Sequence, residues 1–178
     1  LTGKSDYDGA TTVNGSGGLL VTNGATVTYR GGTTLSAGQL LVNGGAKMTS
    51  GGPTTLSSGN TALAVDGQGS AFGTAAMNVA GSNGRVVAVN VTNGGHLDLT
   101  AGGMSLRTQL GTARFTIDGT GSQADMAGGL ALAGGPNTGG AVTISGGGAL
   151  HTAAASTVGT AAGNPQNGTT RLLDISIT

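Results

Sequence analysis

The side chains best suited to acid–base chemistry are two imidazoles and a few aspartates. His96 and His151 are the only histidines, and all seven acidic residues are aspartates. Asp98 and His151 each follow an apolar residue in segments that align, and Asp125 fits the repeat unit between them. An outward column of Asp98, Asp125 and His151 could polarise water. A catalytic site also needs a concavity and nearby aromatic side chains, so we expect a solvated face and predict no catalytic residues.

Metal or cofactor binding is not indicated by these residues either. His96 precedes its apolar neighbour whereas His151 follows its own, so the two histidines are not equivalent. Two repeat units would hold them about 10 Å apart, too far for two ligands with His–metal bonds of about 2.1 Å. Asp66 and Asp118 lack the nine-residue spacing of calcium-binding repeats, and we interpret them as turn caps. Without cysteine, thiolate sites are excluded, and we expect no metal and no cofactor.

Composition limits the elements that can position these side chains. Glycine supplies 38 of 178 residues, and each glycine inside a helix costs about 1 kcal/mol relative to alanine. The 37% hydrophobic content is nevertheless too high for a disordered, self-repelling chain. The formal net charge of zero argues against nucleic-acid binding. No apolar run approaches the roughly 18 residues of a membrane span, so we expect no membrane insertion by this segment.

An internal repeat is the main structural signal. Residues 19–39 align with residues 40–60 without a gap, at a shift of 21 residues. A β-branched anchor before a polar turn recurs along the chain, and another apolar residue stands two positions before each anchor. The anchors are Val21, Val42, Val65, Val91, Ile117, Ile144 and Ile175. A period of two residues is typical of a strand with both side chains on one face.

Two further apolar rows follow each anchor. The second row comes about six residues later, and Phe72 and Met126 are our candidates in the two coils where it is less clear. The third row lies 14 or 15 residues after the anchor, as at Leu35 and Leu56. Three short strands per coil, with Gly-rich and Asn-rich corners, predict an all-β protein. We predict a right-handed parallel β-helix (β-solenoid) of about seven coils, with the handedness taken from the general bias of parallel crossovers.

The predicted solenoid spans residues 13–178. Residues 1–12 are polar and irregular, and could form a partial cap or a continuation of the solenoid. Because the C-terminal residues keep a strand pattern, we expect the natural chain to continue or another subunit to stack there. An antiparallel sandwich is the alternative fold, but it would not require a constant offset among three apolar rows.

Arginines provide the candidate contact surface. The distance from the third row to the next anchor varies between coils while the rest of each coil stays constant, so we expect variable loops to stack along one edge. That variable part contains Arg85, Arg107, Arg114 and Arg171. A guanidinium binds carboxylate or phosphate through two hydrogen bonds. We expect this edge to contact anionic glycans or the Asp-bearing face of a neighbouring molecule; the alternative is that arginine only keeps the loops soluble.

Several runs resemble a known family. VDGQGSAF, VAVNVTNGGHLDL, IDGTGSQADM and AVTISGGGALHT look like the Gly-rich repeats in passenger domains of bacterial autotransporters (type V secretion). The resemblance implies a right-handed β-helical stalk on the Gram-negative cell surface, often an adhesin or a self-associating protein. We therefore expect a non-enzymatic, secreted or surface-attached stalk whose partners are copies of itself, neighbouring surface proteins or anionic glycans. A polysaccharide-degrading β-helical enzyme and a passive spacer or filament subunit are the alternatives.

Overall fold

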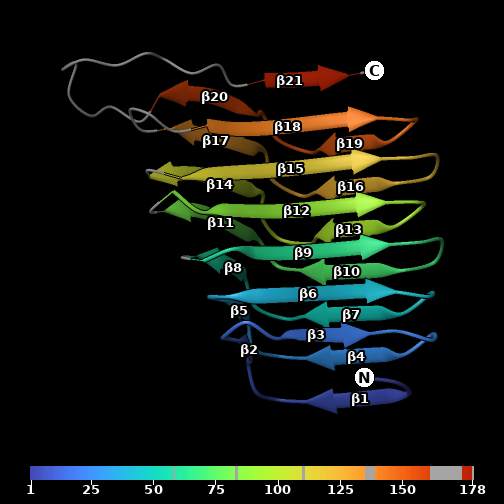
Figure 1. Cartoon of the computed structure of the whole chain (residues 1–178). Helices are drawn as coiled ribbons and strands as arrows, with labels where there is room; N and C mark the ends of the chain where they lie inside the picture. Colours follow the sequence, from blue (N-terminus) through green and yellow to red (C-terminus); the bar gives the residue numbers. More distant parts are fainter. Residues whose placement is uncertain (58, 83, 110, 135–138, 161–173, 178) are drawn as a thin grey trace.

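The computed structural model shows three parallel β-sheets, each formed by the equivalent strands of successive coils (Figure 1). It describes residues 1–178 except 58, 83, 110, 135–138, 161–173 and 178. Sheet A contains β1 (Lys4–Tyr7), β4 (Thr26–Tyr29), β7 (Lys47–Ser50), β10 (Ala71–Thr74), β13 (His96–Leu99), β16 (Gln123–Met126) and β19 (Ala149–Thr152). Sheet B contains β2 (Thr11–Val13), β5 (Thr33–Leu35), β8 (Thr54–Ser57), β11 (Met77–Ser82), β14 (Met104–Gln109), β17 (Leu130–Gly134) and β20 (Thr157–Thr160). Sheet C contains β3 (Gly18–Val21), β6 (Gly38–Asn43), β9 (Thr61–Asp66), β12 (Val86–Thr92), β15 (Thr112–Asp118), β18 (Gly139–Ser145) and β21 (Asp174–Ile177).

Successive strands rotate through the three sheets, so each strand pairs with the equivalent strands one coil before and after it. The chain thus forms a parallel β-solenoid of about six turns, which confirms the predicted fold class; about seven coils were expected. Residues 1–12 supply β1 and the start of β2, which pair in parallel with β4 and β5. Among the described residues, no helix is long and apolar enough to cross a membrane.

The core lies between the three sheets and consists of stacked rows of inward side chains. In sheet C, Leu63 pairs with Leu40 and Val89, and all three are buried. In sheet B, Leu56 lies between Leu35 and Val79, as the third row predicts. The alternation of buried and more exposed positions along β9 shows the period of two that the sequence indicates.

One core assignment from the sequence is wrong. Phe72 stands in the second row as predicted, between Met48 and Leu97, but Met126 does not continue that row. The register places Ala124 next to Leu97, while Met126 stacks on Leu99 two positions further along the strand. The small Ala124 side chain gives this coil too weak a hydrophobic signal at that position for the row to be followed by sequence alone.

The interior is more polar near the N-terminus. The rings of Tyr7 and Tyr29 stack with centroids 5.2 Å apart and an interplanar angle of 7°. The buried Tyr29 hydroxyl is hydrogen-bonded to the Thr33 hydroxyl, and burial raises the pKa of Tyr29 although its hydrogen bonds act in the opposite direction. Ser50 and Thr74 follow the two tyrosines in the same inward row. Hydrogen bonds to neighbouring hydroxyl groups and to backbone carbonyl oxygens make these buried positions tolerable for polar side chains.

Glycines let the coils approach closely at the corner between sheets A and B. A Cβ atom on Gly103 would lie 1.8 Å from the carbonyl oxygen of Gly129 in the next coil. That same oxygen accepts a hydrogen bond from the Met104 amide at 3.2 Å, so the approach is part of the pairing between coils. Gly17, at the corner between sheets B and C, is different because its Cβ would meet nothing within 4 Å.

In the coils that contain β11 to β15, the length variation is absorbed by strands. In sheet B, β5 has three residues and both β11 and β14 have six; in sheet C, β3 has four residues and both β12 and β15 have seven. The prediction that variable loops stack along one edge is therefore wrong for the coils that contain β11 to β15. The added residues pair with neighbouring coils and extend sheets B and C towards their shared corner.

Candidate functional site

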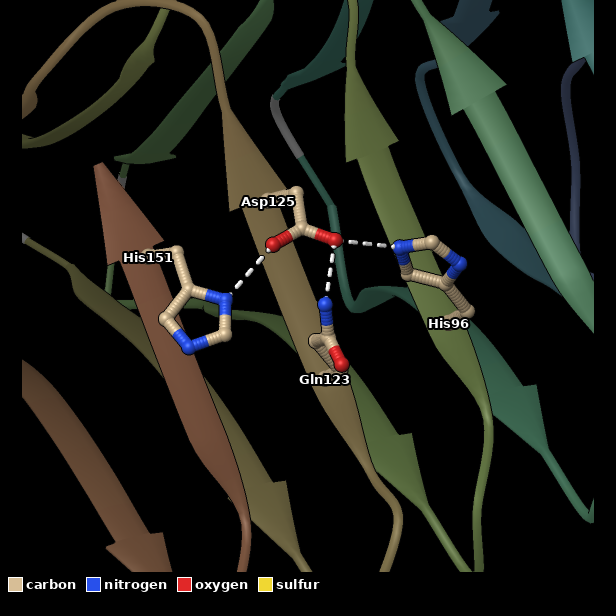
Figure 2. A network of polar contacts seen from close by, with 4 residues as sticks. All are labelled: His96, Gln123, Asp125 and His151. Atoms are coloured by element: carbon tan, nitrogen blue, oxygen red, sulfur yellow. Dashed lines mark hydrogen bonds and ion pairs between the residues drawn. The ribbon is translucent and has the colours of Figure 1, made fainter. Parts of the chain in front are cut away.

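A polar network lies on the outward face of sheet A (Figure 2). The Asp125 carboxylate on β16 accepts hydrogen bonds from His96 Nε2 on β13 at 2.7 Å and from His151 Nδ1 on β19 at 2.8 Å. Gln123, two residues before Asp125 on the same strand, donates its Nε2 to Oδ2 at 2.6 Å. Side chains from three adjacent strands therefore meet at one carboxylate.

The parallel register explains how these side chains meet. Asp125 pairs with Asp98 on one side and with His151 on the other, which confirms the column predicted from the sequence. His96 pairs with Gln123, one outward position away from that column. The two histidines are thus not equivalent, as expected, but the His96 imidazole spans the diagonal to Asp125, so both histidines bind one carboxylate, a contact that was not predicted from the sequence. The available signal was that His96 lies two residues before Asp98, on the same face of the strand.

The electrostatics of the network centre on Asp125. Burial alone would raise the pKa of its carboxyl, but hydrogen bonds from His151, His96 and Gln123 outweigh burial and lower that pKa. An ionised carboxylate only accepts hydrogen bonds, so each imidazole donates to it from the nitrogen that faces it. When neutral, each ring then carries its lone pair on the opposite nitrogen, His96 Nδ1 or His151 Nε2.

The arrangement fixes two imidazoles in a surface patch. The side chains of His96, Asp125 and His151 are 44%, 33% and 63% exposed, respectively. Within the described part of the chain, no group of three or more His, Cys, Asp or Glu side chains is placed to hold a metal ion. The two rings bind opposite oxygens of one carboxylate (Figure 2), so both oxygens of Asp125 are hydrogen-bonded at the surface.

A pH-dependent stability contribution is expected from Asp125. Its pKa is lowered in the folded state, so its contribution is present above the ordinary carboxyl pKa of about 3.9 and is lost as the pH falls through the lower folded value. Asp125→Asn should reduce the free energy of unfolding at pH 6 by no more than about 1 kcal/mol, because the network is partly exposed. Urea unfolding of both proteins between pH 6 and pH 2 should show this difference shrinking. Asp98→Asn, which keeps the three hydrogen bonds, is the matched control, and an equal pH dependence in both variants would contradict the assignment.

The predicted arginine edge is spread over two sheets and their corner. Arg85 immediately precedes β12, and its carbonyl oxygen accepts the Thr112 amide at 2.9 Å. Arg107 lies on β14 between Ala80 and Ala133, and Arg114 lies on β15 between Ala88 and Ala141. These three arginines are exposed. Arg171, the fourth predicted residue, lies outside the described residues.

A shallow groove runs along the corner between sheets B and C, near the N-terminal end of the solenoid. Its lining comes from four successive coils and consists of Gly15, Ser16, Gly17, Gly18, Ala37, Gly38, Gln39, Gly59, Asn60 and Arg85. Arg85 is thus the predicted arginine that lies in a concavity. Sequence reasoning missed the groove because half of its lining residues are glycines, which have no side chain; the only available signal was the cluster of glycines at equivalent corners.

Comparisons of the chain with protein-family models, with curated proteins and with solved structures find no match.

Proposed function

We propose that this chain is a non-enzymatic segment of a secreted or cell-surface β-helical stalk that mediates adhesion or self-association. The observation that carries the proposal is the uninterrupted pairing of equivalent strands in all three sheets. Each coil is hydrogen-bonded to the next along three sides, which makes a rod whose outer faces remain available for contact. The resemblance of its Gly-rich repeats to autotransporter passenger domains supports a location on the Gram-negative surface.

Binding is favoured over polysaccharide hydrolysis by where the ionisable groups lie. Most glycoside hydrolases place two carboxyl groups on either side of the scissile bond. The groove between sheets B and C has no aspartate in its lining, and the Asp125 network lies on sheet A instead. This groove and the Asp125 carboxylate are therefore on different parts of the molecule, which supports a contact role for the groove and for the arginines.

Removing the described arginines tests the adhesive role. We expect cells that display the chain on a membrane anchor to aggregate or adhere, and we expect the triple variant Arg85→Gln, Arg107→Gln, Arg114→Gln to lose most of this binding. Aggregation and adhesion by cells that display the parent chain should weaken as the salt concentration rises from low to physiological, because exposed charge contacts are screened. Circular dichroism checks that the variant keeps its fold.

The control is an arginine substitution outside the proposed surface, with Arg85, Arg107 and Arg114 left in place. Arg30→Gln removes an exposed arginine that pairs with Asp8 at 3.2 Å, outside the proposed surface, and should leave adhesion intact. Parent cells that neither aggregate nor adhere at the same surface density would contradict an adhesive or self-associating role and favour a passive spacer.

A further inference from the structure

We propose that the groove between sheets B and C binds a linear anionic oligosaccharide, with Arg85 pairing a carboxylate of the sugar chain. The inference rests on the proposed adhesive function and assigns a ligand class to one surface. Three properties of the groove carry it: its extent along the solenoid, the hydrogen-bonding character of its lining, and its single charge.

The extent of the groove fits a chain rather than a single ion. Its lining comes from residues 15–18, 37–39, 59–60 and 85, which belong to four successive coils. Adjacent coils are one strand spacing apart, about 4.8 Å, so the lining extends about 14 Å along the axis. A short linear polymer lying along the axis would contact every one of these coils.

The polar groups of the lining suit sugar hydroxyls, which both donate and accept hydrogen bonds. Ser16, Gln39 and Asn60 are exposed, and each carries groups of both kinds. Asn60 Oδ1 accepts the Val86 amide at 3.3 Å, which orients the carboxamide, and its NH₂ group is a donor of the kind that a sugar hydroxyl can accept from. Gly15 and Gly17 have open space where a Cβ would be, so a ligand can approach the backbone there.

The positive charge in the groove favours a ligand that carries negative charge. Arg85 is the sole ionisable side chain in the lining, and it is exposed. A guanidinium binds a carboxylate through two parallel hydrogen bonds, and it stays charged at all physiological pH values. An acidic peptide would also supply carboxylates, but among the described lining residues Ala37 is the only apolar one that could pack against the side chains of a peptide. The observations therefore favour a uronic-acid oligosaccharide.

Titration calorimetry with defined probes tests the site. We expect oligogalacturonate to bind the parent chain, and a neutral maltooligosaccharide of equal length to bind at least about tenfold more weakly. Arg85→Gln should weaken oligogalacturonate binding about tenfold or more, because a charge-assisted pair is lost. Gly17→Leu should abolish it, since the new side chain enters open space at the groove and the backbone φ of Gly17 is not positive.

Control variants separate this site from general attraction of anions. Arg30→Gln removes the same charge at a site outside the proposed surface and should leave oligogalacturonate binding unchanged. The proposal is overturned if Arg85→Gln binds like the parent, if the neutral sugar binds equally well, or if poly-aspartate competes as strongly as the uronide. Cell adhesion that persists without uronide binding would overturn this inference while leaving the adhesive function in place. If cells that display the parent chain do not adhere at all, this result would count against both the adhesive function and the inferred uronide site.

Discussion

Gly103→Ala is expected to destabilise the solenoid by about 3 kcal/mol or more, as forced overpacking of a well-packed site does in its more severe cases. The added methyl group would lie 1.8 Å from the Gly129 carbonyl oxygen and 2.9 Å from the Gly129 nitrogen, so two backbones must separate. Separation would break the hydrogen bond from the Met104 amide to that oxygen. Unlike the end of a flexible side chain, this neighbour has no rotamer that relieves the clash.

Chemical denaturation followed by far-ultraviolet circular dichroism measures the effect. Gly17→Ala is the matched control, because the same methyl group meets nothing within 4 Å there and the φ of Gly17 is not positive. It should change the free energy of unfolding by less than about 1 kcal/mol, with a stabilising sign if the main effect is on the unfolded chain. Equal losses from the two glycine substitutions would show that the coils do not approach as described.

Leu56→Ala should cost about 2–4 kcal/mol of unfolding free energy, the range for a cavity in a core. Leu56 is fully buried, and its neighbours in the inward row are Leu35 and Val79. Because these neighbours are held by backbone pairing within their own strands, they cannot readily move into the space that the substitution leaves. The shift of the urea midpoint multiplied by the m-value gives this loss of unfolding free energy.

Leu41→Ser tests the opposite face of the sheet. Leu41 lies between Leu20 and Ala64 in an outward row of sheet C and is only half-buried. Its replacement should cost under about 1 kcal/mol, because surface changes away from the core have small effects. A loss as large as that of Leu56→Ala would mean that the assignment of inward and outward faces is reversed.

The inward rows were predictable because every coil needs an apolar side chain at the same position of its stacked strand. Leu35, Leu56 and Val79 fill the same place in three successive coils, and any polar residue there would be buried without water. Such positions tolerate few residue types, so their spacing survives in the sequence even where the coil length changes. The three sheets, the parallel register and the core of the solenoid follow from that spacing.

Outward contacts were less predictable because surface positions accept many residue types. The column of Asp98, Asp125 and His151 follows from the register, but His96 reaches Asp125 diagonally through the length of its side chain. No pattern of spacing specifies which rotamer a surface imidazole adopts. The groove is a further case. It exists where glycines leave space, and no particular side chain in the sequence indicates such a space.

The stacked rings of Tyr7 and Tyr29 provide a built-in optical reporter. They are the only tyrosines and the chain has no tryptophan, so tyrosine emission originates entirely from the N-terminal coils. Far-ultraviolet dichroism, in contrast, averages over the three sheets. Because each coil contacts only its neighbours, the two ends of such a rod need not melt together. The separation between the fluorescence and dichroism melting curves therefore measures, without any added label, how far unfolding spreads from one coil to the next.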